Sequence, residues 1–187
     1  MTRLFVALNI PDEIKKKIVE LRRDLVNQIP GNQYEKLRWE PEEKLHLTLK
    51  FIGEVEDSIV NKIVDAVDFI KEYEKLNSEL TKFGFFYKKK APKILWIGLK
   101  IDSSVYKLTE ELNKKMQKFF IPIENREFSA HLTLLRIKNN LDKNFIASFE
   151  QFVIPETKFI AEDISLIKSE LLPEGSKYTE IKKINLK

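Results

Sequence analysis

The sequence has no cysteine, only two histidines and only five glycines among its 187 residues. Without cysteine, the chain forms no disulfide, has no thiolate nucleophile and cannot build a zinc or iron–sulfur site that needs sulfur ligands. The few glycines form no Walker-type loop of the kind that cradles nucleotide phosphates. The apolar run in residues 1–10 is too short for a signal peptide or a membrane helix, so we expect a cytoplasmic protein without membrane association.

The composition is that of a folded globular protein. Hydrophobic residues make up 43% of the sequence and charged residues 33%, and a chain of this length buries enough surface for a hydrophobic core. No Gly-, Ser- or charge-rich linker divides it, so we expect one domain spanning residues 1–187. The 33 basic residues exceed the 29 acidic residues, which gives a net charge of +4. A basic balance suits an anionic partner such as RNA, although the same charges also solvate an ordinary surface.

The first half of the sequence predicts a strand, a helix and a second strand. Residues 3–10 combine apolar and β-branched side chains like a strand, and residues 14–25 carry apolar side chains at helical spacing. A polar loop with a proline then leads to an apolar run at residues 45–52, which Gly53 is expected to end.

The second half repeats this order. A strand at residues 94–99 precedes a helix at 103–116, a loop with a proline and a strand at 131–137. A strand–turn–strand unit is expected in each half, at residues 80–99 and at 158–184, and the second turns at residues 173–175. We interpret the sequence as two lobes that share one fold.

Both histidines of the chain begin the same tetrapeptide. His46 and His131 each start the sequence His-Leu-Thr-Leu, 85 positions apart. Side chains alternate along a strand, so each histidine is expected to share a face with the threonine two residues later, Thr48 or Thr133, while the leucines face the core. A lone histidine in an apolar strand is usually a core residue, but two identical copies favour a function.

A pair of imidazoles is suited to phosphoryl transfer. Histidine titrates near neutrality, so one ring can be neutral and take a proton from water while the other is protonated and gives one to a leaving oxygen. Each such transfer contributes typically about 10²–10⁴-fold to the rate. The hydroxyls of Thr48 and Thr133 can donate to the non-bridging phosphate oxygens.

Metal binding is the rival use of two histidines. Zinc usually takes at least three protein ligands, and no carboxylate recurs at the same spacing in both copies of the tetrapeptide. We therefore expect neither a metal ion nor another cofactor.

Several segments together resemble one known superfamily. They are residues 3–7 (RLFVA), 46–54 (HLTLKFIGE), 95–96 (LW), 131–138 (HLTLLRIK) and 169–178 (SELLPEGSKY). In this order they resemble the 2H phosphoesterases, and within them the RNA 2′,3′-cyclic phosphodiesterases, also called 2′-5′ RNA ligases. The resemblance implies a bilobal α+β fold with pseudo-twofold symmetry, in which two antiparallel sheets line a central cleft and helices pack on their outer faces.

The resemblance also implies an activity. Family members hydrolyse an RNA 2′,3′-cyclic phosphate to a 2′-phosphomonoester, and some also join RNA ends through a 2′,5′ linkage. By this resemblance His46 is the proton donor and His131 the proton acceptor, an assignment that the identical tetrapeptides do not give by themselves. We expect a monomer that acts on RNA ends or 2′,3′-cyclic nucleotides without a protein partner. The alternative is a catalytically silent module that binds RNA ends or nucleotides.

Three basic residues are candidates to bind the substrate. Arg136 matches the arginine that follows the second motif in the family, and Arg3 matches an arginine of the first strand. Strict alternation from His131 places Arg136 on the opposite face, as a strand charge facing solvent. The same count places Lys50 on the face of His46, which makes Lys50 the better geometric candidate for positive charge in the groove.

Apolar and aromatic residues complete the candidate pocket. Leu135 occupies a position that is usually small in relatives, and alternation places it beside His131, where it would narrow the pocket. Aromatic side chains stack bases in readers of single-stranded RNA, but they also fill cores. The candidates for a base-stacking role are Phe5, Phe85, Phe86, Trp96 and Tyr178.

Overall fold

The computed structural model of the chain describes residues 1–29, 37–124, 127–138, 141–173 and 175–187. Glu174, in the turn predicted at residues 173–175, lies outside them. In chain order the elements are β1 (Thr2–Asn9), α1 (Asp12–Asn27), η2 (Glu42–Lys44), β2 (His46–Val55), α2 (Asp57–Ala66), η3 (Asp68–Glu72), β3 (Leu76–Lys88), β4 (Ala91–Ile101), α3 (Ser104–Gln117), β5 (His131–Arg136), α4 (Lys143–Gln151), β6 (Lys158–Ala161), β7 (Asp163–Leu172) and β8 (Gly175–Asn185).

The strands form two antiparallel groups that meet at the centre of the molecule. Within the described ranges, the sheet has the order β6-β3-β4-β5-β2-β1-β7-β8. Strands β2, β1, β7 and β8 make the first lobe, and β6, β3, β4 and β5 make the second. The lobes join where β2 pairs with β5, and the one register pair assigned there in the described chain is Leu47 with Leu132. The two predicted groups of antiparallel strands are therefore present, but they are joined edge to edge in one eight-stranded sheet rather than forming two separate sheets.

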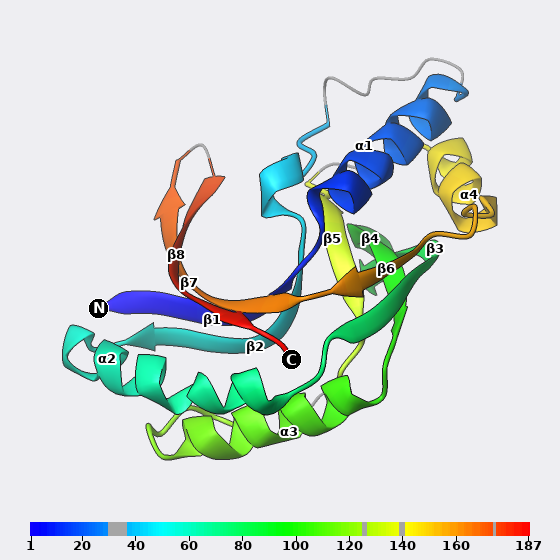
Figure 1. The fold of residues 1–187 in the computed structure, drawn as a ribbon. Coiled ribbons are helices and arrows are strands. Elements are labelled where there is room, and N and C mark those ends of the chain that lie inside the picture. The colour runs from blue at the N-terminus through cyan, green and yellow to red at the C-terminus, as the bar shows by residue number, and fades with distance from the viewer. Residues whose placement is uncertain (30–36, 125–126, 139–140, 174) are drawn as a thin grey trace.

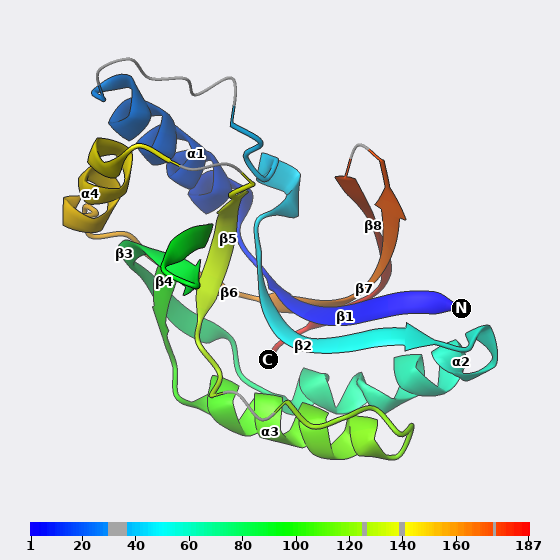
Figure 2. The same ribbon diagram turned by 180° about the vertical axis from the view of Figure 1, so that it is seen from behind.

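Helices cover the outer sides of the two lobes (Figures 1 and 2). In both views α1 and α4 lie side by side next to the lobe of β3, β4 and β5, whereas α2 and α3 lie along β1 and β2. The order β1–α1–β2 repeats as β4–α3–β5, which confirms the predicted repeat and the α+β class. None of the helices in the described ranges is long and apolar enough to cross a membrane.

The helices pack through the apolar faces that the sequence predicts. Ile14, Ile18 and Leu25 of α1 are buried, as are Leu108 and Leu112 of α3. Spacings of three, four and seven residues place such side chains on one side of a helix. These residues join one hydrophobic cluster that extends through both lobes, so the motif strands are held against a shared core.

Each motif strand contains a β-bulge shortly after its histidine. In β2 the register with β1 passes from Ala7–Thr48 to Val6–Lys50 and leaves Leu49 as the extra residue. In β5 the register with β4 passes from Trp96–Thr133 to Leu95–Leu135 and leaves an extra residue at position 134. A bulge sets two residues of one strand against one of its partner, which reverses the alternation beyond it.

Strand β2 does not end at Gly53 as predicted. It continues to Val55, and Gly53 adopts a φ of +85° next to a second register shift with β1. Such a φ is accessible to glycine at little cost, so the glycine permits a bend within the strand rather than its termination.

Candidate active site

The pairing of β2 with β5 brings the two histidines together. Leu47 and Leu132 are register partners, and His46 and His131 directly precede them as the first residues of their strands. In an antiparallel pair, the residue before one partner lies level with the residue after the other. Each histidine therefore lies level with the threonine of the other motif.

Both imidazoles are oriented by the same hydrogen bond. Nδ1 of His46 lies 2.7 Å from the carbonyl oxygen of Lys44, and Nδ1 of His131 lies 2.7 Å from that of Ser129. A carbonyl oxygen only accepts, so Nδ1 of each ring carries the hydrogen and donates it. In the neutral rings Nε2 is consequently the nitrogen that carries the lone pair, so it is the atom that can accept a proton and, once protonated, deliver one in the reaction.

Burial makes both histidines weaker bases than usual. It lowers the pKa of His46 from 6.5 to about 4, against the hydrogen bond to Lys44 and with a smaller contribution from the charge of Arg136. Burial also lowers the pKa of His131. Desolvation disfavours the charged imidazolium, so both rings are neutral at pH 7 in the free protein.

Aromatic rings surround each imidazole. The ring of Phe5 lies 5.0 Å from that of His46 and the ring of Tyr178 lies 5.7 Å from it. In the second lobe, Phe86 and Trp96 lie 4.9 and 6.3 Å from the ring of His131. Contacts at these centroid distances restrict the rings and exclude water from their faces.

The two threonines are half-buried beside the histidines. Oγ1 of Thr48 lies 3.1 Å from Nε2 of His46, so the hydroxyl donates to the neutral ring or accepts from the protonated one. Thr133 pairs in register with Trp96. Nε1 of Trp96 is buried, and it is the one such side-chain nitrogen in the described chain without a hydrogen-bond partner.

Arg136 lies on the side of the histidines, so the alternative given by strict alternation, in which it faces away from them, is wrong. Its charge acts on both His46 and Tyr178, and its Nε donates to Oε1 of Glu40 at 3.1 Å. The cause is the bulge at Leu134, which reverses the alternation between His131 and Arg136.

The corresponding bulge in β2 turns Lys50 away from the face of His46. Its side chain is 2% exposed, and its ammonium donates to the carbonyl oxygen of Pro122 at 2.8 Å. The prediction that Lys50 supplies positive charge beside His46 is therefore wrong. Leu135 is also buried in the main core, so it does not narrow the pocket beside His131.

The remaining predicted binding residues divide between core and surface. Arg3 is exposed on β1, and its charge acts on Tyr178. Burial is the main cause that raises the pKa of Tyr178, and Glu40 raises it further. Phe5 is buried beneath His46, and Phe85 belongs to the main core. Phe86 remains 37% exposed next to the second histidine.

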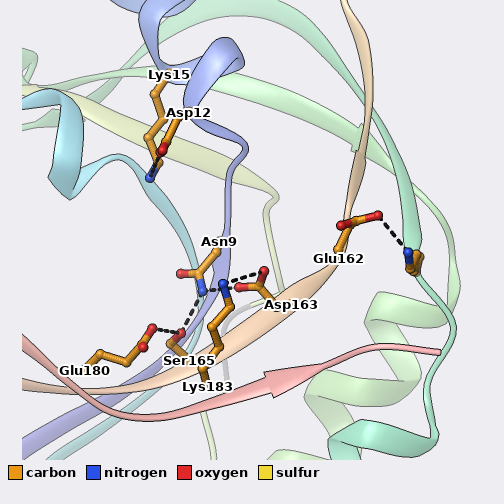
Figure 3. Close-up of polar contacts among 9 residues, drawn as sticks. Asn9, Asp12, Lys15, Glu162, Asp163, Ser165, Glu180 and Lys183 are labelled. Carbon is orange, nitrogen blue, oxygen red and sulfur yellow. Dashed lines mark hydrogen bonds and ion pairs between the residues drawn. The ribbon is translucent and has the colours of Figure 1, made fainter.

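A polar pocket of about 480 Å³ opens next to the first histidine, with His46 and Tyr178 in its wall. Side chains from β1, β7 and β8 also line it and converge on Asn9 (Figure 3). The amide of Asn9 donates to Asp163 and, at 2.7 Å, to Ser165.

Further bonds tie this network to β8. Ser165 donates to Glu180 at 2.5 Å, and Lys183 pairs with Asp163 at 3.1 Å. Asn9 is the register partner of His46, so the network fixes the backbone on which the first histidine is built. No group of three or more His, Cys, Asp or Glu side chains suited to a metal ion occurs in the described ranges.

Two residues near the histidines escape the sequence reasoning. Glu40 lies in the segment before η2 and has no motif to mark it. Phe51 is 56% exposed, and its ring lies 6.3 Å from that of Phe5. The signal that would reveal Phe51 and Arg136 is the bulge before each, which neither glycine nor proline announces in the sequence.

Comparisons with known proteins find similar sequences among phosphoesterases. Residues 8–96 match the family model described as LigT like phosphoesterase. An RNA 2′,3′-cyclic phosphodiesterase of Thermotoga maritima is 27% identical over 177 residues, which cover 94% of this chain and 91% of the relative. A relative of the same name from Methanocaldococcus jannaschii is 28% identical over 184 residues, which cover 96% and 98%.

Solved structures show the same fold. TT0787 of Thermus thermophilus superposes with a TM-score of 0.78 at 24% identity, covering 98% of this chain and 97% of that one. Apo LigT of Escherichia coli superposes with a TM-score of 0.74 at 23% identity, covering 99% and 97%. The family model, the relatives and the fold agree in their similarity to the LigT-like phosphoesterases, which are 2H phosphoesterases. The chain is therefore a phosphoesterase.

Proposed function

We propose that this phosphoesterase hydrolyses the 2′,3′-cyclic phosphate at RNA ends to a 2′-phosphomonoester, with two histidines as general acid and base. The observation that carries the proposal is the matched geometry of His46 and His131, whose Nδ1–H groups both donate to backbone carbonyl oxygens. This leaves two Nε2 atoms for proton transfer. The activity named for the relatives from Thermotoga maritima and Methanocaldococcus jannaschii supports the same substrate.

The proposed reaction is one in-line displacement at phosphorus. Neutral His131 takes a proton from water through Nε2, and the resulting hydroxide oxygen bonds to phosphorus. The bond from phosphorus to the 3′ oxygen breaks, and protonated His46 delivers its Nε2 proton to that oxygen. Exchange with solvent then returns both rings to their starting states.

The negative charge of the bound substrate has to raise the pKa of His46, so that this ring becomes protonated. The pKa of this ring is about 4 in the free protein, so few molecules carry the imidazolium at pH 7. A negatively charged phosphate beside the ring favours its protonated form and raises the pKa. The acid is thus formed mainly when the anionic substrate is bound.

Other side chains bind the phosphate and the nucleoside in this proposal. The hydroxyls of Thr48 and Thr133 donate to the non-bridging oxygens, and the guanidinium of Arg136 neutralises their charge. Arg3 lies near the hydroxyl of Tyr178 and adds positive charge at the edge of the site. Phe5 supports His46 from below, which leaves the half-buried ring of Tyr178 to contact the base.

The reverse reaction would join RNA ends. If the 5′-hydroxyl of a second RNA replaces the water, the same two proton transfers form a 2′,5′ linkage from the cyclic phosphate. We propose ligation as a secondary activity, and a monomeric cytoplasmic protein that acts on RNA ends or small 2′,3′-cyclic nucleotides.

The test is hydrolysis of an oligonucleotide with a 2′,3′-cyclic phosphate in the presence of EDTA, with the product identified by ³¹P NMR. The proposal predicts turnover with a 2′-phosphate as the sole isomer. A 3′-phosphate product would show that the 2′ oxygen leaves, and not the 3′ oxygen as proposed. Binding without turnover between pH 5 and 9, where histidines normally titrate, would favour the catalytically silent module.

A further inference from the structure

We propose that Glu40 is a positioning residue, which holds the guanidinium of Arg136 in the orientation that binds the substrate's phosphate. The inference rests on the proposed function, because it assumes a phosphate between the histidines. Arg136 Nε donates to Glu40 Oε1 at 3.1 Å, and the two side chains are 60% and 20% exposed. An exposed ion pair of this kind contributes little to stability on its own, so its value here lies in geometry.

The backbone of Glu40 is fixed on both sides. Its N–H donates to the carbonyl oxygen of Leu134 at 2.8 Å, and its carbonyl oxygen accepts from Nη1 of Arg22 at 2.9 Å. Leu134 is the extra residue of the bulge that turns Arg136 toward the site. The carboxylate is therefore anchored to the same irregularity that aims the arginine.

Buried groups hold this anchor in place. The side chain of Arg22 is 4% exposed, and its guanidinium lies 5.0 Å from the ring of Trp39. Trp39 in turn forms a β-bridge with Leu135. A surface carboxylate that is only solvated needs no such support. These contacts fix Glu40 relative to both β5 and α1.

The contact leaves Arg136 able to bind an anion. A guanidinium has five N–H donors in a fixed plane, and Glu40 takes the one on Nε. The two Nη atoms form the other edge of the plane, which matches the spacing of two phosphate oxygens. An arginine that is already oriented loses less side-chain freedom when it binds.

A carboxylate near a phosphate could instead oppose binding by charge repulsion. The two roles predict opposite effects of removing Glu40. Positioning predicts that the benefit of Glu40 operates through Arg136 and disappears with it, whereas repulsion predicts tighter phosphate binding in every variant that lacks the carboxylate.

The experiment measures the affinity for inorganic phosphate by calorimetry, and kcat and KM for the cyclic-phosphate oligonucleotide. The variants are Glu40→Ala, Glu40→Gln, Arg136→Ala and the double variant Glu40→Ala with Arg136→Ala. Glu72→Ala is the matched control, because Glu72 forms a comparable exposed ion pair with Lys187 at 2.6 Å. Thermal melts establish that each variant is folded.

We expect Glu40→Ala to lower phosphate affinity and kcat/KM by about 10- to 100-fold, the range that a misplacement of about 1 Å costs. Glu40→Gln keeps an oxygen that accepts from Nε, so its phosphate affinity and kcat/KM stay within about threefold of wild type. The Glu72→Ala control stays within the same range. In the Arg136→Ala background, loss of Glu40 has no further effect.

Three results would overturn the inference: tighter phosphate binding by Glu40→Ala, an undiminished effect of Glu40→Ala without Arg136, or no phosphate binding by wild type. Failure of the proposed function has a different signature. If wild type binds phosphate with the predicted dependence on Glu40 but does not turn over the oligonucleotide, the inference stands and only the proposed substrate is lost.

Discussion

Lys50 and Leu135 occupy equivalent positions in the two lobes: each directly follows the bulge of its motif strand, and each side chain is 2% exposed. One is a lysine and the other a leucine, yet backbone geometry sends both inward. The next residue in each strand, Phe51 or Arg136, is exposed instead. The bulges therefore decide which side chains of the two strands are exposed beyond the threonines.

Replacing Lys50 with methionine tests this assignment. Lys50→Met keeps the buried stem but loses the hydrogen bond to Pro122, so the free energy of unfolding should fall by about 1 kcal/mol and Tm by about 2–4 °C. Because the ammonium is bonded to Pro122 and does not lie beside His46, kcat/KM should stay close to that of wild type.

Arg136→Met is the matched comparison. It should lower kcat/KM by about 100-fold, the scale expected for removing one donor to a developing oxyanion, and leave Tm almost unchanged. Equal losses of kcat/KM in Lys50→Met and Arg136→Met would show that the bulge in β2 does not redirect Lys50.

Gly84 is expected to be intolerant of a side chain because the indole of Trp96 lies directly over it. A methyl group there would lie 2.3 Å from Cζ2 and 2.6 Å from Cη2 of Trp96. Gly84→Ala should therefore displace the ring, at a cost of about 1–3 kcal/mol, and disturb His131 beside it. Thermal melts and indole fluorescence measure both effects.

The smaller ring of phenylalanine provides the control for this clash. In a Trp96→Phe background, Gly84→Ala should cost clearly less stability than it does in wild type. An equal cost in both backgrounds would locate the strain in the backbone of β3 and contradict the proposed contact.

The pH dependence should differ between kcat/KM and kcat. The profile of kcat/KM reports the free enzyme, in which burial lowers the pKa of His46 to about 4 and that of His131 below 6.5. The base requires a pH above the pKa of His131, and the acid requires a pH below that of His46. The product of the two fractions is largest between these values, so kcat/KM should peak below pH 6.5.

In the substrate complex the phosphate raises the pKa of His46, so the basic limb of kcat should lie at higher pH than that of kcat/KM. Initial rates from pH 4 to 9 with the cyclic-phosphate oligonucleotide measure both profiles. Coincident basic limbs would show that the substrate does not protonate this ring. If kcat/KM falls only at low pH and shows no basic limb, the reaction requires no general acid.

The separate roles of the histidines can be tested with a substrate in which sulfur replaces the bridging 3′ oxygen. A thiolate leaves without protonation because thiols are far stronger acids than alcohols. His46→Ala should regain most of its lost kcat/KM on this substrate, whereas His131→Ala should not, since it still lacks the base. If His131→Ala is rescued instead, His131 is the general acid and His46 the general base.

The sequence predicts much of the fold because its patterns are local. The apolar spacing of α1 and α3 and the alternation of the strands depend on neighbouring residues, and the structure confirms these elements. The equivalent placement of His46 and His131 is also predictable, because an exact repeat of a tetrapeptide within a repeated order of elements implies equivalent positions.

The groove beyond the threonines is not predictable in the same way. Counting in steps of two from His46 or His131 assigns Lys50, Leu135 and Arg136 to the wrong faces, since one extra residue reverses every later position. The bulged residues are leucines, which fit a regular strand equally well. Glu40 depends on a contact with a residue 96 positions away, and no local pattern encodes such a contact.

The most direct test of the two-histidine mechanism compares kcat/KM in EDTA for wild type, His46→Ala, His131→Ala and the double variant on the cyclic-phosphate oligonucleotide. Catalytic groups that act as a unit are strongly non-additive. We predict that each single variant loses at least about 10³-fold and that the double variant loses no more than about tenfold beyond the worse single. Near-wild-type activity in either single variant, or losses that multiply in the double, would contradict a mechanism in which the two imidazoles act together.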